Sequence, residues 1–251
     1  MTQNIALITG ASGGIATALA ERLGEQGWQL ALVSRQASAV ADTRDRVWIQ
    51  ADVSTAEGAQ TAVHTCLEKL GRPRALVNCA GSTLLLPLHR TTEADFRNCL
   101  GANLDTAFFT LKAFVEAVRS AGDEDAGESP DFRAVLMSSV VAQVGVVNHE
   151  AISAGKAAIE GLVRAAAATY APWLRINAVA PGLVATKATA RILASEAGRR
   201  AAARQYPLGR YGSPADVAGL IAWLVGPEAS WVSGQVWQVD GAFTGTRPMV
   251  R

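Results

Sequence analysis

A short apolar run that leads directly into a glycine-rich turn constrains the fold of this chain more than any other feature. Residues 5–9 read IALIT, and residues 10–16 read GASGGIA. Glycines let the backbone turn sharply after a strand, and the following helix then presents its first N–H groups at the turn. This order predicts a β-α unit whose turn binds a phosphate group.

Short apolar runs and longer amphipathic stretches alternate along the rest of the chain. The apolar runs show little polar alternation, which is typical of parallel strands covered by helices on both faces. Strands are expected at 5–9, 30–34, 46–50, 75–78, 134–138, 175–180 and 235–240. Helices are expected at 15–26, 55–70, 92–120, 151–170 and 214–225. The pattern predicts an α/β fold with a Rossmann-type doubly wound parallel sheet of about seven strands flanked by helices.

The chain is expected to form one domain over residues 1–251. Length alone could suit two domains, but α/β folds of 251 residues commonly form one, and no repeat or linker divides the sequence. An acidic segment rich in glycine and proline, residues 121–131, is expected to be a solvated loop before the fifth strand.

Composition excludes several classes of partner. The net charge is +1 without a basic block, which argues against nucleic acid or an anionic membrane as the main partner. No stretch approaches the ~20 apolar residues of a membrane helix, and the N-terminus lacks the pattern of a signal peptide. The three cysteines, Cys66, Cys79 and Cys99, have no metal-ligand spacing. We therefore expect a cytoplasmic protein with reduced thiols and no metal site.

The glycine turn and the end of the second strand predict the cofactor. Ligands of doubly wound sheets bind at the carboxyl ends of the strands, where the strand order reverses. The second strand ends at Ser34 and Arg35, without the acidic residue that usually binds the ribose of NAD. An arginine can instead face a 2′-phosphate, so NADP(H) is favoured over NAD(H). The pyrophosphate is expected at Gly10, Ser12, Gly13, Gly14 and Ile15.

Further motifs follow the later strands in a fixed order. Residues 78–81 read NCAG, residues 137–145 read MSSVVAQVG, and residues 177–186 read NAVAPGLVAT. With the glycine turn and PLGRYGSPADVA at 207–218, they resemble the short-chain dehydrogenase/reductase family over nearly the whole chain. The pattern is most similar to the branch of 3-oxoacyl-carrier-protein reductases and sugar or alcohol dehydrogenases.

The resemblance implies the remaining site residues and the assembly. It implies catalytic roles for Asn103, Ser139 and Lys156, a small-molecule substrate, and a homodimer or homotetramer paired through helices 92–120 and 151–170. Burial of these helices within one subunit is the alternative, and a mixed oligomer is a further one. The implied cofactor contacts beyond those above are Asp52, Val53, Asn78, Ala80, Gly81, Lys156, Pro181, Gly182 and Thr186.

The chain departs from the family at Ile152. The family places a tyrosine four residues before its lysine, and that tyrosine transfers a proton; Ile152 can neither donate nor accept one. Positions i, i+3 and i+7 share a helix face, so His149 joins Ile152 and Lys156 in one stripe if the helix extends back to it. This spacing resembles enoyl reductases of the same superfamily, and histidine is a proton donor near neutral pH. His149 is therefore a further catalytic candidate.

Three functions remain open on this basis. The first is an atypical NADP(H)-dependent reductase of a carbonyl, hydroxyl or enoyl compound, with the proton from Ser139, His149, water or the substrate. The second is a cofactor-binding subunit or nucleotide-sensing regulator without redox turnover, and the third is dehydration or isomerisation. The retained Asn103, Ser139, Lys156 and Thr186 favour the first. Specificity is expected from residues 82–90 and from 187–212, a substrate loop or lid.

Overall fold

The sheet of this protein has seven parallel strands in a doubly wound order. The computed structural model describes residues 4–122 and 132–246. The strand order is β3-β2-β1-β4-β5-β6-β7, with every neighbouring pair parallel. The strands are β1 (Ile5–Thr9), β2 (Gln29–Ser34), β3 (Arg46–Gln50), β4 (Ala75–Asn78), β5 (Phe132–Met137), β6 (Leu174–Pro181) and β7 (Val236–Val239). The predicted fold class is confirmed.

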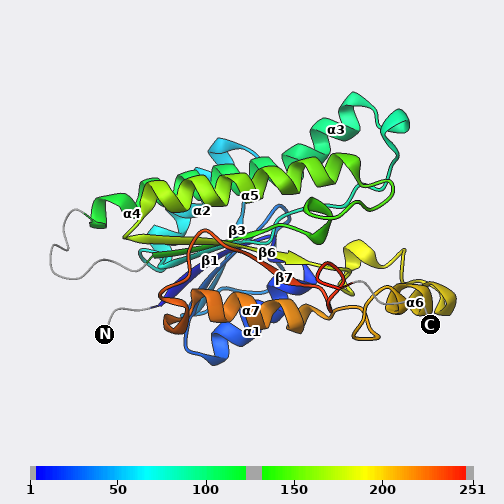
Figure 1. Ribbon diagram of the computed structural model, residues 1–251. Helices are drawn as coiled ribbons and strands as arrows, with labels where there is room; N and C mark the ends of the chain where they lie inside the picture. The colour runs from blue at the N-terminus through cyan, green and yellow to red at the C-terminus, as the bar shows by residue number, and fades with distance from the viewer. Residues whose placement is uncertain (1–3, 123–131, 247–251) are drawn as a thin grey trace.

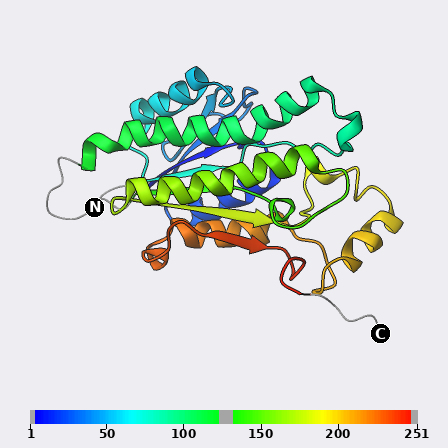
Figure 2. The ribbon, with the colours of Figure 1, turned by 45° about the horizontal axis from the view of Figure 1, so that its top comes forward.

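Helices cover both faces of this sheet (Figure 1). On one face lie α1 (Gly14–Glu25) and α7 (Pro214–Val225), and on the other lie α2 (Ala56–Lys69), α4 (Thr106–Gly122) and α5 (Glu150–Tyr170). Figure 2 shows α4 and α5 side by side across the sheet. Each face has its own apolar core. The central strands are buried on both sides, which explains why their sequences are apolar throughout.

The strand order reverses between β1 and β4, and the remaining elements gather at the carboxyl end of the sheet. The chain runs outward from β1 through β2 to β3, then returns to place β4 on the other side of β1. At the carboxyl end lie η1 (Leu88–Arg90), α3 (Glu93–Leu100), η3 (Val140–Ala142), η4 (Lys187–Thr189) and α6 (Glu196–Arg204). A further short turn, η5 (Pro227–Ala229), precedes β7. The fold therefore places its ligand-binding end where the sequence motifs are.

The expected helix 92–120 is interrupted. The structure has α3, then a π-helical turn η2 (Gly101–Asp105), then α4. Inside the turn, the Asn103 amide donates to the carbonyl of Cys99 at 2.9 Å, and the Thr106 hydroxyl donates to the carbonyl of Ala102 at 3.1 Å. Side chains thus bind backbone carbonyls where the turn widens, and such π turns are frequent at functional sites.

Three other expectations concern segments rather than strands. The segment 187–200, expected to be a loop, contains η4 and the start of α6, which the hydroxyl of Ser195 caps by accepting from the Gly198 amide at 3.0 Å. Residues 123–131 of the acidic segment lie outside the described residues, and residues 121 and 122 end α4. Across residues 4–122 and 132–246, no helix has the length and apolar character needed to cross a membrane.

Candidate functional site

A cleft of about 980 Å³ opens at the point where the strand order reverses. Most of the residues predicted to bind the adenosine and pyrophosphate line it: Gly10, Ser12, Gly13, Ser34, Arg35, Asp52, Val53, Ala80 and Gly81. The far wall comes from α3 and the π turn, which the sequence analysis did not assign to the site: Arg97, Asn98, Gly101, Ala102 and Thr106. The cleft therefore lies between the glycine turn and the interrupted helix.

The glycine turn packs directly on the backbone after β4. Gly10 has φ +66°, and a Cβ there would lie 2.7 Å from the amide nitrogen of Ala80, so only glycine fits. Gly13 is the N-cap of α1, and no side chain among the described residues caps that helix. The first N–H groups of α1 are thus left for a ligand, and the positive end of the helix favours an anion.

The loop after β6, residues 182–186, reaches the glycine turn from the other side. A Cβ on Gly14 would lie 3.6 Å from Cγ2 of Thr186 and 3.4 Å from Cγ of Pro214. Thr186 is the N-cap of η4, and its backbone amide donates a hydrogen bond to the hydroxyl of Thr189 at 3.0 Å. The structure therefore brings the predicted residues Gly14 and Thr186 together at the base of α1.

The end of the cleft where the sequence predicts the adenosine is lined by polar residues. The Asp52 carboxylate accepts hydrogen bonds from the Ser54 hydroxyl at 2.7 Å and the Ser54 amide at 3.1 Å, and these bonds lower the pKa of Asp52. Arg35 is exposed, and its backbone carbonyl accepts a hydrogen bond from the side-chain amide of Gln50 at 3.2 Å. Ser34 is buried, and its hydroxyl donates to the carbonyl of Gln36. Arg35 therefore supplies a positive charge beside Ser34 at this end of the cleft.

Lys156 and Asn103 meet beside Gly81. The ammonium of Lys156 donates to the carbonyl of Met137 at 2.8 Å, and burial lowers the pKa of Lys156 to about 8. A Cβ on Gly81 would lie 2.9 Å from Oδ1 of Asn103 and 3.6 Å from Nζ of Lys156. Oδ1 of Asn103 is buried and has no hydrogen-bond partner among the described residues. This polar corner adjoins the cleft through Gly81.

Ser139 lies at the end of β5 with a weakly engaged hydroxyl. Its Oγ donates to the carbonyl of Pro181 and accepts from the Val141 amide, at 3.5 and 3.4 Å, the long end of the hydrogen-bond range. The neighbouring Ser138 instead donates to Glu160 at 2.9 Å. Ser138 belongs to a buried network in which Gln143 also donates to Glu160, at 3.1 Å. The sequence analysis missed Glu160, which stands one turn after Lys156.

Ile152 is buried in a small apolar cluster of its own. It lies one turn before Lys156 on α5 and is 4% exposed. The cluster joins the start of α5 to α3 and to the loops after β4 and β5; its members are Leu84, Phe96, Cys99, Val141, Ala151 and Ile152. The side chain at position 152 thus contributes shape and apolar surface rather than a polar group.

The three cysteines are free thiols; Cys66 and Cys99 are buried, and Cys79 is half-buried.

The helical stripe expected from His149 to Lys156 does not extend back to His149. Asn148 has φ 63°, which turns the chain, and α5 begins at Glu150 with His149 as its N-cap. The Nδ1 nitrogen of His149 lies 2.7 Å from the carbonyl of Val147; because a carbonyl only accepts, Nδ1 carries the proton there. The ring is therefore directed at the preceding loop, and His149 is not a member of the Ile152 cluster.

Several predicted residues lie behind the cleft rather than on its surface. Asn78 is buried and donates to the carbonyl of Thr106 at 2.9 Å and the hydroxyl of Thr110 at 3.0 Å, so it ties β4 to α4. Ile15 packs on the core beneath α1. Pro181 ends β6, and Gly182, which follows it, lies against Tyr206, a residue that was not predicted from the sequence.

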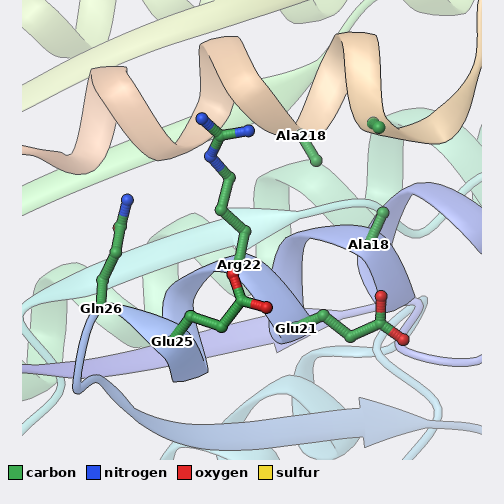
Figure 3. A pocket seen from close by; sticks show the side chains of 7 residues that line it. Ala18, Glu21, Arg22, Glu25, Gln26 and Ala218 are labelled. Atoms are coloured by element: carbon green, nitrogen blue, oxygen red, sulfur yellow. The ribbon is translucent and has the colours of Figure 1, made fainter.

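A second hollow, of about 420 Å³, lies between α1 and α7 (Figure 3). Arg22 extends from α1 toward α7, where a Cβ on Gly219 would lie 3.6 Å from its Nη1. None of the predicted site residues lines this hollow; its walls are Ala18, Glu21, Arg22, Glu25, Gln26, Ala215 and Ala218. The cleft beside β1 and β4 is therefore the candidate site.

Comparison with known proteins agrees with this placement. Residues 10–244 match a family model described as Enoyl-(Acyl carrier protein) reductase. Carbonyl reductase family member 4 of Danio rerio is 34% identical over 94% of this chain and 96% of its own. The 3-oxoacyl-[acyl-carrier-protein] reductase of a Synechocystis strain is 31% identical over 96% of this chain and 97% of its own. A short-chain dehydrogenase/reductase from Brucella melitensis, a glucose/ribitol dehydrogenase, has a solved structure that is 29% identical, with 97% of each chain covered and a TM-score of 0.87. The chain belongs to the short-chain dehydrogenase/reductase family.

Proposed function

We propose that this protein is an atypical NADP(H)-dependent oxidoreductase that acts on a small molecule with a carbonyl, hydroxyl or enoyl group. The polar corner formed by Gly81, Asn103 and Lys156 carries the proposal. Burying an acceptor such as Oδ1 of Asn103 without a hydrogen-bond partner costs free energy. Because this atom lies beside Gly81, which has no side chain and lines the cleft, a bound ligand or water is the expected partner. A subunit with only a structural role has no need of this arrangement.

The residues of the cleft fit the dinucleotide that the proposal requires. The open N-terminus of α1 and the glycine at position 10 would hold the pyrophosphate. Asp52 and Val53 would contact the adenine, and Ser34 and Arg35 would hold a 2′-phosphate, for which a guanidinium is well suited. Lys156 would hold the nicotinamide ribose. When bound, such a cofactor supplies a hydride from its nicotinamide ring.

Proton transfer is the part of the chemistry that this site lacks in its usual form. Ile152 stands where the family resemblance expects a tyrosine, and loss of a general acid costs ~10²–10⁴-fold in rate, or roughly 3–5 kcal/mol. Ser139 has a hydroxyl that is held only by long hydrogen bonds, so it can donate to a substrate oxygen. The proton then comes from Ser139, from His149, from water or from the substrate itself.

Lys156 is available to bind the cofactor in this chemistry. An ammonium has three donors, and one of them is used on the carbonyl of Met137. A lysine with a pKa of about 8 is still mainly protonated at neutral pH, so the remaining donors can bind a ribose. Because no tyrosine hydroxyl in residues 4–122 and 132–246 forms a hydrogen bond with Lys156, we assign Lys156 to cofactor binding rather than to lowering the pKa of another residue.

The names of the relatives support a small-molecule substrate, since they are reductases and dehydrogenases of such compounds. We extend the proposal to a lid over residues 187–212 and to a cytoplasmic location, which the three free thiols favour. We also propose a homodimer or homotetramer. The resemblance to the family, whose helices at 92–120 and 151–170 pair between subunits, supports this assembly.

A cofactor-binding subunit without redox turnover is the second candidate. The burial of Ile152 among apolar side chains favours it, because position 152 then has no polar group that could donate a proton to a substrate. The two candidates share the cofactor and differ in turnover, so one pair of measurements separates them.

The test is cofactor binding followed by turnover. Wild-type protein is titrated with NADPH and NADH, and NADPH oxidation is then followed against β-ketoacyl thioesters, ketones and enoyl thioesters. We expect tighter binding of NADPH and slow oxidation with at least one class. Equal or tighter NADH binding would overturn the NADP(H) assignment. Binding without any oxidation would favour the silent subunit, and binding of neither cofactor would contradict both candidates.

A further inference from the structure

The segment 187–206, which follows the loop after β6, is exposed along most of its length and is anchored at its far end. Between Lys187 and Arg204 only Ala202 is buried. Tyr206, two residues after α6, is 7% exposed and turns back into the molecule. Burial raises the pKa of Tyr206, so its phenol stays protonated at neutral pH. Tyr206 is therefore the aromatic anchor of this segment.

Three segments meet at the Tyr206 ring. Its hydroxyl accepts a hydrogen bond from the amide of Leu183 at 2.6 Å. A Cβ on Gly182 would lie 2.9 Å from Cε1 of the ring, so the ring fills the space beside that glycine. On its other side the ring packs against Phe243 with the centroids 5.3 Å apart. The anchor thus joins the loop after β6, the end of α6 and the turn after β7.

The amide and the carbonyl of Leu183 are both bound by residues near the far end of the segment 187–212. Its amide donates to Tyr206, and its carbonyl accepts from the amide of Gly212 at 2.8 Å. The amide of Ala185 donates back to the carbonyl of Gly212 at 2.9 Å. The chain therefore leaves at Thr186 and returns to the same place at Gly212, and Tyr206 adds a side-chain hydrogen bond to this pairing.

We propose that Tyr206 is a positioning residue for the nicotinamide half of the cofactor, acting through the Leu183 amide on the loop from Pro181 to Thr186. The inference rests on the proposed function. Without the hydroxyl, the half-buried Leu183 amide loses its acceptor, and the loop that reaches Gly14 through Thr186 loses one of the contacts that fix it. Gly10 and Ala80, which would hold the adenosine half, contact each other and do not depend on Tyr206.

The experiment compares two ligands on a variant that keeps the ring and removes only the hydroxyl, Tyr206→Phe. The ligands are NADPH and 2′-phospho-ADP-ribose, which lacks the nicotinamide, or NADH and ADP-ribose if wild type prefers NADH. The matched control is Tyr211→Phe, because the Tyr211 hydroxyl makes no hydrogen bond to the described residues. Dissociation constants are measured by calorimetry.

We expect Tyr206→Phe to weaken NADPH binding about tenfold, equivalent to ~1.4 kcal/mol, and to leave the fragment within about twofold of wild type. Tyr211→Phe should change neither. Unchanged NADPH binding in Tyr206→Phe would overturn the inference, and so would equal weakening of both ligands, which marks a general loss of folded protein. If the wild-type protein binds neither ligand, the proposed function is refuted, and the positioning role with it. If the wild type binds NADPH and only the result for Tyr206→Phe differs from the expectation, the positioning role alone is refuted.

Discussion

Ile152 and Lys156 lie one turn apart on α5 and are equally buried, at 4% and 5% exposed, but they end in opposite environments. Ile152 packs among apolar side chains from α3 and two loops, whereas the Lys156 ammonium donates to the carbonyl of Met137 at 2.8 Å. The site therefore has a cation at position 156 and an apolar side chain one turn earlier, at position 152. The predictions below separate what each of the two positions does.

Ile152→Tyr should create faster ketone reduction at a cost in stability. A positioned general acid contributes ~10²–10⁴-fold, so we expect an increase in this range with ketones and β-ketoacyl thioesters. The tyrosine must enter a packed cluster, and overpacking of roughly 1–3 kcal/mol lowers the melting temperature by about 2–10 °C. NADPH oxidation and thermal unfolding measure the two effects.

The matched control for this change is Ile152→Phe, which has nearly the same ring without the hydroxyl. It should lose as much stability as the tyrosine variant and gain no activity. If both variants gained activity equally, the effect would come from reshaping the cluster, and the assignment of position 152 as the missing proton donor would be wrong.

Arg35→Ala should lower the affinity for NADPH and leave that for NADH nearly unchanged. A charge-assisted hydrogen bond is worth ~1.5–3 kcal/mol, and we expect about tenfold because Arg35 is exposed to solvent. Arg44→Ala is the control, since Arg44 is also exposed but does not line the cleft. Calorimetric titration with both cofactors checks this; a parallel loss for NADPH and NADH would speak against a 2′-phosphate contact.

Lys156 should make the stability of the protein depend on pH in the alkaline range. Burial lowers the pKa of Lys156 from 10.5 to about 8, so between these values the unfolded chain binds the proton and the folded protein does not. Raising the pH through this window therefore favours the folded state. The free energy of unfolding of wild type should rise relative to Lys156→Met from about pH 8 to about pH 10.

Urea unfolding of both proteins at a series of pH values measures this difference. The buried thiols titrate in the same range with the opposite sign, since burial raises the pKa of Cys66 and Cys79 to about 12. Cys66 is present in both proteins and does not interact with Lys156, so its contribution cancels in the comparison. The charge of Lys156 lowers the pKa of Cys79, so this coupling is part of the difference between the two proteins. Parallel curves for wild type and Lys156→Met would show that the lysine is not desolvated as the structure has it.

Ser139→Ala should reduce turnover more than His149→Ala. The Ser139 hydroxyl lies between the ends of β5 and β6 with only long hydrogen bonds, whereas the His149 ring is bonded to the carbonyl of Val147 in the preceding loop. We expect about 10–100-fold loss for Ser139→Ala and less than about threefold for His149→Ala. Steady-state rates with the best substrate of the panel decide it, and the reverse ranking would make His149 the proton donor.

The strands of this fold could be predicted because their apolar runs depend on burial alone. The run IALIT became β1, and residues 214–225 became α7, at the expected bounds. The π turn at Gly101–Asp105 could not be predicted in the same way, because it depends on bonds such as that from Asn103 to the carbonyl of Cys99. Periodicity reports a helix there and does not report its widening.

Site residues were predictable where a motif fixes the backbone and not where the tertiary structure brings side chains together. The glycine at position 10 is required by its positive φ and its contact with Ala80, so the motif identifies it. Arg97 reaches the cleft only because the strand order places α3 opposite the glycine turn. Tyr206 lies 23 residues after Leu183 in sequence, and no local pattern marks their contact.

The most direct test of the account follows the hydrogen that the cofactor would transfer. Wild-type protein is incubated with NADPH deuterated at nicotinamide C4 and with the ketone, β-ketoacyl thioester and enoyl thioester panel, and the products are analysed by mass spectrometry. The account predicts a deuterated product from wild type, made more slowly than by Ile152→Tyr. Deuterated product from Ile152→Tyr alone, with wild type binding NADPH but transferring nothing, would contradict it.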